Sequence, residues 1–540
     1  MFRVCEGQKL ASREENAVKS FIQKYEKDVM GSLSGFDRLV FRGTLRRLFY
    51  PQGMDYCLAF MGVLLKDFAK YVLEVTARIK EASLAVARRS GRPIEYLASS
   101  QICKEDLARE MAARDHLAEG LICVLSCVEP CQTFEIHRHR ELKRLQIRPH
   151  RSKCLHLYHY FFHPQFGFMS ARLQTWFPLT IQVCLNGREW LSRQLTQEGI
   201  AFQQRGNCFT WIEDPGRAQE IMERLLRTSW PSLLQEIAGQ LNPSHRELFG
   251  DFDLRYYWSV HQSEWATDIM FRDPEKLASV YPHFLRHGLS TFASPDVMRF
   301  LGRKIPPTGN LPPAFAGEVV SRLTKRPEGI RIKHRLGSNH IKLYDKEGSN
   351  LRVETTINQT GDFKVLRRKE GDSHGELSWR PLRKGVADLH RRARVSEAAN
   401  RRYLKALAAV QDTASLGSLT DKFCRPTTWK GQRLRALNPY GPEDLTLLKA
   451  VARGEFTING FRNRDLAKLL YAAAQDLTPL EKRRQSGAVT RKLRLLRAHG
   501  LIKKVPKTHR YYLTASGLKA VTAIIAALHA SSDSLIKLAA

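Results

Sequence analysis

The feature that most constrains the fold of this chain is an ordered series of helical and strand patterns near its C-terminal end. Residues 443–455 and 463–473 have helical spacing, and residues 486–500 place Val489, Leu493 and Leu496 on one helical face. Residues 501–514, LIKKVPKTHRYYLT, read as a two-stranded hairpin. An amphipathic helix follows at 515–530. This order of elements predicts a winged helix-turn-helix domain over residues 441–530.

The phrase LRLLRAHGLIKKVPKTHRYYLT, residues 493–514, resembles MarR-like winged-helix proteins. In that family a recognition helix ends in a short turn, and a basic wing tip precedes a Tyr-x-Leu-Thr sequence. The resemblance implies that the domain binds duplex DNA. Winged-helix proteins of this kind often dimerise, and the apolar stripe of residues 515–530 could serve a homodimer.

Charge supports a DNA-binding role for this region. Residues 482–510 contain 11 Lys or Arg and no Asp or Glu. Arg491 and Arg494 lie opposite the apolar face of the third helix, from where they could reach guanine edges in a major groove. The residues expected to contact DNA are Ser486, Thr490, Arg491, Arg494, Arg497, Lys503, Lys504, Lys507, His509 and Arg510. The alternative is a winged helix that binds protein and has a solvated basic face.

The whole chain is strongly basic, with 87 Lys and Arg against 54 Asp and Glu and a formal net charge of +33. Such an excess destabilises a compact chain unless a polyanion offsets it. Nucleic acid is the expected partner, because the charge is spread through sequence that looks folded; an acidic membrane surface is the alternative. No apolar run is long enough to cross a membrane and no signal-peptide pattern opens the chain, so a cytoplasmic protein is expected.

A chain of 540 residues is too long for one ordinary core, so several domains are expected. The patterns predict an α+β multidomain protein with a helical N-terminal part, an antiparallel-sheet middle region and the C-terminal winged helix-turn-helix. The expected boundaries are 1–118 for the helical region, 119–305 for the α+β region, 318–410 for hairpins and a basic helix that continue it, and 441–530. Residues 306–317, PPTGNLPPAFAG, read as a linker. Cys123, Cys127 and Cys131 recur at helical spacing in an apolar segment and are expected to be buried thiols.

The segment 364–405 has 13 Lys or Arg against 5 Asp or Glu. Its predicted helix, 385–410, could follow a phosphate backbone, although a solvated face is the alternative. The residues expected to track phosphates are Arg391, Arg392, Arg394, Arg401 and Arg402.

The string HIKLYDKEGSNLRVETTIN, residues 340–358, resembles a segment of the initiators of rolling-circle replication of plasmids and phages. Those proteins have a palm-like antiparallel sheet, and they nick one DNA strand with a tyrosine and a metal ion held by histidines and carboxylates. The resemblance implies an association with a mobile element. Its candidate catalytic residues here are Tyr344, Asp345, Glu354, Glu264 and Asp268.

A nicking reaction would require a divalent ion, Mg²⁺ or Mn²⁺, to polarise the phosphate. His159 and His163 are the candidate ligands, because on a strand they share a face. The spacing departs from the initiators, in which one residue separates the two histidines. Asp37, in GFDRLVFRG, is a further acidic candidate. No other cofactor is evident from the sequence.

These patterns favour a DNA-binding protein, associated with a mobile element or its regulation, that uses a C-terminal winged helix and a basic middle region. Two alternatives stay open. The first is a metal-dependent DNA-nicking or strand-transfer enzyme, so the sequence leaves open whether the protein is an enzyme. The second is an RNA-binding protein whose middle sheet holds single strands.

Overall fold

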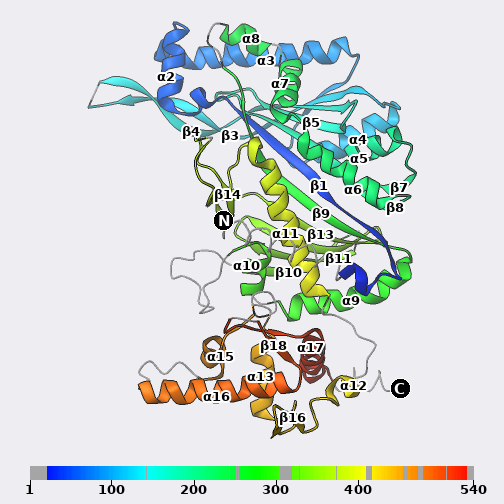
Figure 1. Cartoon of the computed structure of the whole chain (residues 1–540). Helices are drawn as coiled ribbons and strands as arrows, with labels where there is room; N and C mark the ends of the chain where they lie inside the picture. The colour runs from blue at the N-terminus through cyan, green and yellow to red at the C-terminus, as the bar shows by residue number, and fades with distance from the viewer. Residues whose placement is uncertain are drawn as a thin grey trace. The chain divides into compact units, whose positions relative to one another are not determined.

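The computed structural model describes residues 21–531, apart from positions 142, 243, 251, 253, 293 and 373 and the segments 304–318, 327–328, 409–415, 454–455, 457–459, 472–477 and 506–507. The expected linker at 306–317 therefore lies outside the described residues. The dominant element is an 11-stranded sheet with the order β10-β11-β12-β13-β9-β1-β6-β5-β4-β3-β2 (Figure 1).

The strands of this sheet are β1 (Val29–Thr44), β2 (Ile94–Leu97), β3 (Gly120–His139), β4 (Arg144–His163), β5 (Gly167–Gln174), β6 (Ile181–Asn186), β9 (Tyr257–Phe271), β10 (Val319–Arg326), β11 (Gly329–Leu336), β12 (Asn339–Lys346) and β13 (Asn350–Ile357). The smaller hairpins are β7 (Phe202–Arg205) with β8 (Cys208–Ile212), β14 (Lys364–Arg367) with β15 (Ser378–Pro381), β16 (Thr427–Trp429) with β17 (Gln432–Leu434), and β18 (Ile502–Lys504) with β19 (Tyr511–Leu513).

The helices are α2 (Pro51–Phe60), α3 (Phe68–Arg89), α4 (Lys104–Arg114), α5 (Gly187–Gln197), α6 (Pro215–Arg224), α7 (Trp230–Leu241), α8 (Ser244–Phe249), α9 (Pro274–Ser290), α10 (Ser294–Phe300), α11 (Leu389–Leu407), α12 (Leu416–Thr420), α13 (Pro442–Val451), α15 (Asn463–Leu470), α16 (Pro479–Ala498) and α17 (Ala515–His529). Short 3-10 turns are η1 (Arg46–Phe49), η2 (Leu65–Asp67), η3 (Leu225–Arg227), η4 (Thr360–Asp362) and η5 (Val386–Asp388).

Side-chain periodicity explains where the strands form. In β6, Ile181, Val183 and Leu185 are buried and alternate with partly exposed residues, as expected of a strand with one covered face. In β13 every residue is buried, as expected of a strand covered on both faces. The central part of the sheet therefore contains polar side chains that only other protein groups can satisfy.

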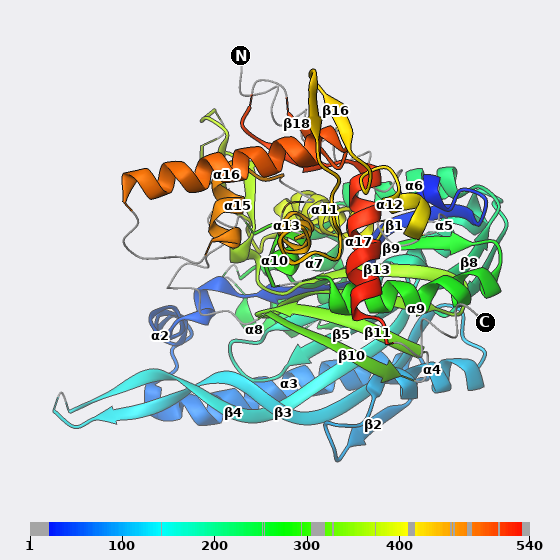
Figure 2. The same cartoon turned by 90° about the horizontal axis from the view of Figure 1, so that it is seen from below.

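The chain divides into two compact units. One comprises Gly31–Asp268 and Thr356–Glu397. Within it, α3 and α4 pack on β3, and α5 packs on β5 (Figure 2). Residues of α4, such as Ala108 and Met111, share a core with Ile122 and Leu125 of β3. These helices cover the sheet and leave the outer ends of β3 and β4 as a projecting ribbon.

The other unit comprises Met1–Met30, Ile269–Thr355 and Ala398–Ala540. Within it, α9 packs against β10, β11 and β12, and α10 packs against β10 and β11. The C-terminal elements from α12 to α17 share one hydrophobic core, which includes Leu448, Leu466, Leu493, Ile502 and Val521.

The predicted fold class is wrong in its N-terminal and middle parts. The described part of the predicted region 1–118, residues 21–118, does not form a separate helical part, because β1, a strand of 16 residues, and β2 belong to the large sheet. The sheet is mixed and not purely antiparallel, because β2 pairs with β3 in parallel. The short apolar run GFDRLVFRG marks β1 but does not indicate its length.

The predicted winged helix-turn-helix is also not clear in the structure. The elements follow the expected order, but residues 471–478 separate α15 from α16, whereas a helix-turn-helix joins its helices by a turn of about three or four residues. Helix α16 begins at Pro479 and not near Ser486. Each strand of the expected wing has three residues. The reason lies in the first turn of α16, where Thr478 and Glu481 form a capping box that starts the helix early.

Candidate functional site

Helix α16 presents the clearest cationic surface among the described residues of the C-terminal part. It is 20 residues long and buries Val489, Leu493 and Leu496 on one face. Lys482, Arg483, Arg484 and Arg491 are all exposed, and helical spacing places Arg484 and Arg491 opposite the buried stripe. This division follows from helical periodicity, since the core takes one stripe of the helix and leaves the basic residues in solvent.

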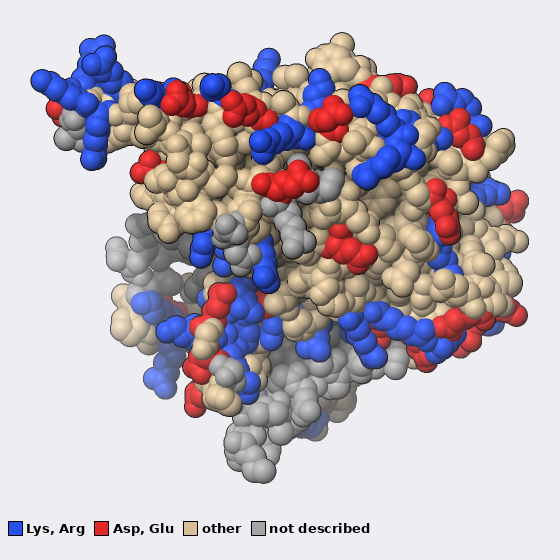
Figure 3. Space-filling model, turned by 90° about the horizontal axis from the view of Figure 1, so that it is seen from above, with Lys and Arg blue, Asp and Glu red and all other residues tan. Residues whose placement is uncertain are grey.

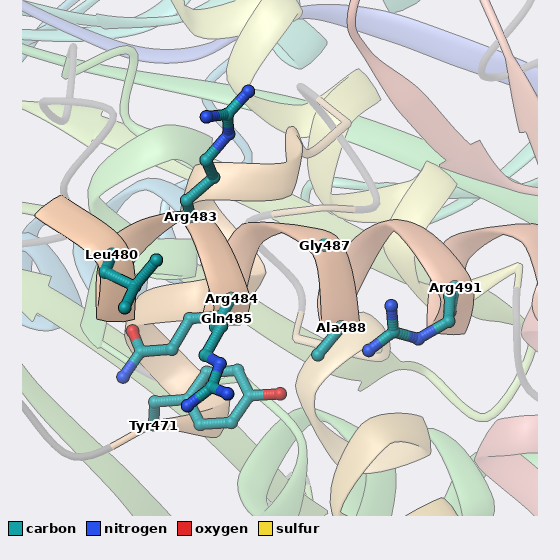
Figure 4. Close-up of a pocket in the computed structure, with 8 residues that line it drawn as sticks. All are labelled: Tyr471, Leu480, Arg483, Arg484, Gln485, Gly487, Ala488 and Arg491. Carbon is teal, nitrogen blue, oxygen red and sulfur yellow. The ribbon is translucent and has the colours of Figure 1, made fainter.

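A pocket of about 540 Å³ lies along the N-terminal half of α16 (Figure 4). Its lining residues are Tyr471, Leu480, Arg483, Arg484, Gln485, Gly487, Ala488 and Arg491. In Figure 4, Arg484 lies beside Tyr471 and Arg491 points toward Ala488. Arg483 points away from the side chains of Arg484 and Arg491. Among the described residues, the lining includes three arginines and no Asp or Glu, and guanidinium is well suited to phosphate oxygens.

Other predicted DNA contacts on α16 are engaged within the protein. Asn463 donates from Nδ2 to the Ser486 carbonyl and to the Thr490 hydroxyl, both at 2.9 Å. Arg494 hydrogen-bonds to Gln432 of β17. Arg494 and Arg497 also lie over the Trp429 ring, 5.8 and 5.0 Å from its centroid. Of the three arginines expected to contact DNA on this helix, Arg491 is exposed, whereas Arg494 and Arg497 are half-buried.

The β18–β19 hairpin contributes further cations. Lys503 and Lys504 are exposed and pair in register with Tyr512 and Tyr511. His509 is exposed, Arg510 is partly buried, and Lys507 lies outside the described residues.

Helix α11 does not present the predicted row of phosphate contacts. Arg392 is 1% exposed; its guanidinium donates to the Ser263 hydroxyl at 2.7 Å, to the Val260 carbonyl at 2.8 Å and to the Ile357 carbonyl. Burial lowers the pKa of Arg392 to about 9. The prediction that Arg392 contacts phosphates is wrong, because the face of α11 that carries Arg392 is packed inside the protein.

The other arginines of α11 differ in exposure. Arg391 pairs with Asp388 at 2.7 Å, and Arg402 donates to the Phe300 carbonyl at 2.9 Å. Arg401 is partly buried, and Arg394 is exposed. Within the described helix, Arg394 is therefore the member of the predicted set most open to a phosphate.

The structure brings together three residues of the 340–358 segment. Glu354 of β13 accepts from Lys342 Nζ at 2.5 Å and from the Tyr344 hydroxyl at 2.7 Å, both from β12. Burial opposes the charge of Glu354, but Lys342 and the hydrogen bonds together hold the pKa of this carboxyl below its ordinary value. Asp345 is different, because burial raises its pKa.

A second pair of carboxylates lies on β1 and β9. Asp37 is buried and accepts from Asn207 Nδ2 at 2.9 and 2.8 Å, and Glu264 is partly buried. Each of Asp37, Glu264 and Glu354 offers a carboxylate oxygen, and these oxygens lie within 4.8 Å of one another. The strands β13, β9 and β1 are consecutive in the sheet. Oxygen ligands of this kind suit hard divalent cations such as Mg²⁺.

The sequence singled out each of these carboxylates but did not group them, because they are far apart along the chain. Asp268, the other candidate on β9, is committed elsewhere: it forms a buried ion pair with Arg188 at 2.9 Å. Grouping the three carboxylates requires the order of the strands in the sheet, and no local sequence pattern contains that order.

The predicted histidine ligands are not part of this acidic group. His159 is fully buried, and burial lowers its pKa to about 4. His163 is partly exposed and accepts the Gln165 backbone N–H at Nδ1, at 3.1 Å. Among the described residues, the group of side chains that could hold an ion includes neither histidine.

Among the described residues, no helix combines the length and the apolar character that crossing a membrane requires. No protein-family model matches the chain, and the searches of curated proteins and of solved structures found no match either.

Proposed function

We propose that the protein binds duplex DNA and holds phosphates on the exposed cationic surface of α16. The observation that carries the proposal is the pocket whose described lining includes Arg483, Arg484 and Arg491 but no Asp or Glu. The net charge of +33 supports it, because a polyanionic partner offsets self-repulsion.

The test uses the full-length protein and a fluorescent duplex. Changing Arg483, Arg484 and Arg491 together to Gln removes three cations that would neutralise phosphates. We expect weaker binding to every sequence, with the salt dependence of log K reduced by about 0.9 for each phosphate that is no longer neutralised. Anisotropy titrations over a range of salt concentrations measure both quantities.

The matched control removes three exposed cations from α3, Lys80, Arg88 and Arg89, by changing them to Gln. The two variants have the same net charge. Equal affinity of the α16 variant and this control would contradict a binding role for the α16 surface. Binding of single-stranded RNA in preference to duplex DNA of the same sequence would instead favour an RNA-binding function.

The acidic side chains support a second candidate function, metal-dependent cleavage of a DNA strand. Asp37, Glu264 and Glu354 would hold a divalent ion, which would polarise a phosphodiester and stabilise the leaving oxygen. The Tyr344 hydroxyl donates to Glu354 at 2.7 Å and so lies beside this group.

End-labelled duplex and single-stranded DNA, with and without Mn²⁺, test this function on denaturing gels. We expect Glu264→Gln to abolish metal-dependent cleavage and to remove the rise in melting temperature that Mn²⁺ causes. Glu220→Gln, on the exposed face of α6, is the control. Uncut DNA with wild-type protein in Mn²⁺ would leave DNA binding as the function.

A further inference from the structure

Strands β3 and β4 form a ribbon that extends well past their neighbours. β2 pairs with β3 only over Val124–Cys127, and β5 pairs with β4 only over His156–His163. From the pair Val128–Leu155 to the pair His139–Arg144, neither strand pairs with a third strand in the part of the chain that is described; at the inner end, the Thr175 backbone N–H still donates to the Leu155 carbonyl at 3.3 Å. Twelve residues per strand at about 3.3 Å each give the ribbon a length of about 40 Å.

The inner part of the ribbon is fixed to its own unit. Thr133, Phe134 and Ile147 are buried, and Gln174 Nε2 donates to the Gln132 carbonyl at 3.1 Å. Helix α2 and the turn η2 pack on β4, and α3 packs on β3. An isolated two-stranded ribbon is marginally stable, so this anchoring explains how the outer part can extend (Figures 1 and 2).

The outer part of the ribbon is cationic. Between residues 135 and 153 there are seven Lys or Arg and two Glu, and Lys and Arg gather at the end of the projection (Figure 3). The seven cations, all exposed, are Arg138, Arg140, Lys143, Arg144, Arg148, Arg151 and Lys153. One of the two carboxylates, Glu135, lies 3.1 Å from His150 Nδ1. The seven side chains have no carboxylate partner in the described part of the chain.

The cations occupy both faces of the ribbon. Register places Arg144 and Arg148 on one face, where their partners across the ribbon are His139 and Glu135. Arg138 lies on the other face, as alternation along a strand requires. A ribbon inside a DNA groove has a phosphate backbone on each side. Cations on both faces of the ribbon therefore fit a DNA groove better than they fit a flat anionic surface, which would contact only one face.

We propose that the β3–β4 ribbon is an arm that enters a groove of duplex DNA. A two-stranded β-ribbon fits the major groove in width. The inference rests on the proposed function, since it assumes that the protein binds DNA, and it adds a second contact surface with a defined shape.

Two variants test the arm. Arg138, Arg144 and Arg148 are changed together to Gln, which keeps the ribbon and removes charge. In the second variant, Asn-Gly replaces residues 137–146, so a two-residue turn joins the paired Ile136 and Ile147. We would measure binding by hydroxyl-radical footprinting and by anisotropy with a duplex of about 40 base pairs. This duplex has roughly four helical turns, so it is longer than the ribbon.

We expect both variants to bind about tenfold more weakly or worse, and to lose protection of one groove segment that α16 variants retain. Unchanged affinity and footprint, while the α16 variant binds weakly, would overturn the arm and leave the proposed function standing. Failure of the wild-type protein to bind any duplex would overturn both.

The triple change of Lys80, Arg88 and Arg89 to Gln again serves as the charge control. If it weakens binding as much as the arm variants do, the effect is one of net charge, and the arm is not a specific contact. Vesicles rich in phosphatidylserine provide the last comparison. Arm-dependent binding to vesicles without arm-dependent binding to DNA would assign the ribbon to a membrane surface and overturn the proposal.

Discussion

At the scale of single residues, the buried charges determine which substitutions the protein tolerates. Asp444, on α13, is 3% exposed and accepts from both terminal nitrogens of Arg435 at 2.7 Å and from the Asn438 backbone N–H at 2.9 Å. A carboxylate satisfied in this way is stabilising only while it is ionised.

Asp444→Asn should lower the free energy of unfolding by about 1–3 kcal/mol, because it removes charged hydrogen bonds and leaves Arg435 without its counter-ion. Burial opposes the charge, but Arg435 and Asn438 lower the pKa of Asp444. The wild-type advantage should therefore be full above about pH 4, the ordinary aspartate pKa, and should disappear as the pH falls through the lowered folded-state pKa. Urea unfolding from pH 7 to pH 3 measures it; a constant difference between the two proteins would contradict this assignment.

Glu354→Gln should lower stability by about 3–5 kcal/mol, because it removes the buried carboxylate that pairs at 2.5 Å with the largely buried ammonium of Lys342. Tyr344→Phe removes one hydrogen bond to the same carboxylate and should cost about 1 kcal/mol. Thermal unfolding of the two variants gives both values. If Glu354→Gln is as stable as the wild type, the carboxylate does not serve the fold, and any loss of cleavage would then be chemical.

At the scale of an element, the start of α5 depends on one side chain. The side-chain oxygen Oδ1 of Asn186 accepts the backbone N–H of Arg188 at 2.7 Å and of Glu189 at 3.3 Å. This cap fixes the helix that carries Arg188 into its buried ion pair with Asp268. The first turn of a helix leaves N–H groups that only such a cap or water can satisfy.

Asn186→Ala should therefore lower the free energy of unfolding by about 1 kcal/mol. Asn186→Asp keeps the acceptor and adds a negative charge at a helix N-terminus, so it should be close to neutral. Chemical denaturation at pH 7 compares the two. Equal destabilisation by both changes would show that the amide donors of Asn186, and not its acceptor oxygen, matter at this position.

At the scale of the whole molecule, the net charge of +33 should make stability depend on the ions present. Added salt screens repulsion among exposed cations, and a polyanion that binds the folded protein stabilises it by mass action. The midpoint of thermal unfolding should rise with heparin and, to a smaller extent, with NaCl. Scanning calorimetry at pH 7 measures both; a midpoint that heparin leaves unchanged would argue against a polyanion-binding surface on the folded protein.

Local patterns predicted much that is local. The apolar stripe of α16, the order of elements in residues 443–530 and the hairpin of β11 and β12 follow from spacing and turn residues within a few positions of each other. Cys123, Cys127 and Cys131 show the limit of such patterns. They are buried, as expected, but they lie on β3 and not on a helix, because a spacing of four residues keeps side chains on one face of either element.

The sequence by itself determined the charge, the buried and exposed faces of individual elements and the polar residue types available for chemistry. Only the tertiary structure decided which strands are neighbours in the large sheet, that Arg392 faces the interior, and that the 20-residue strands β3 and β4 pair with each other far past the flanking strands. The physical reason is that helical and strand periodicity is encoded within each segment, whereas strand pairing joins segments through backbone hydrogen bonds that are the same for every residue type. Order and register are therefore selected by the burial of the whole assembly.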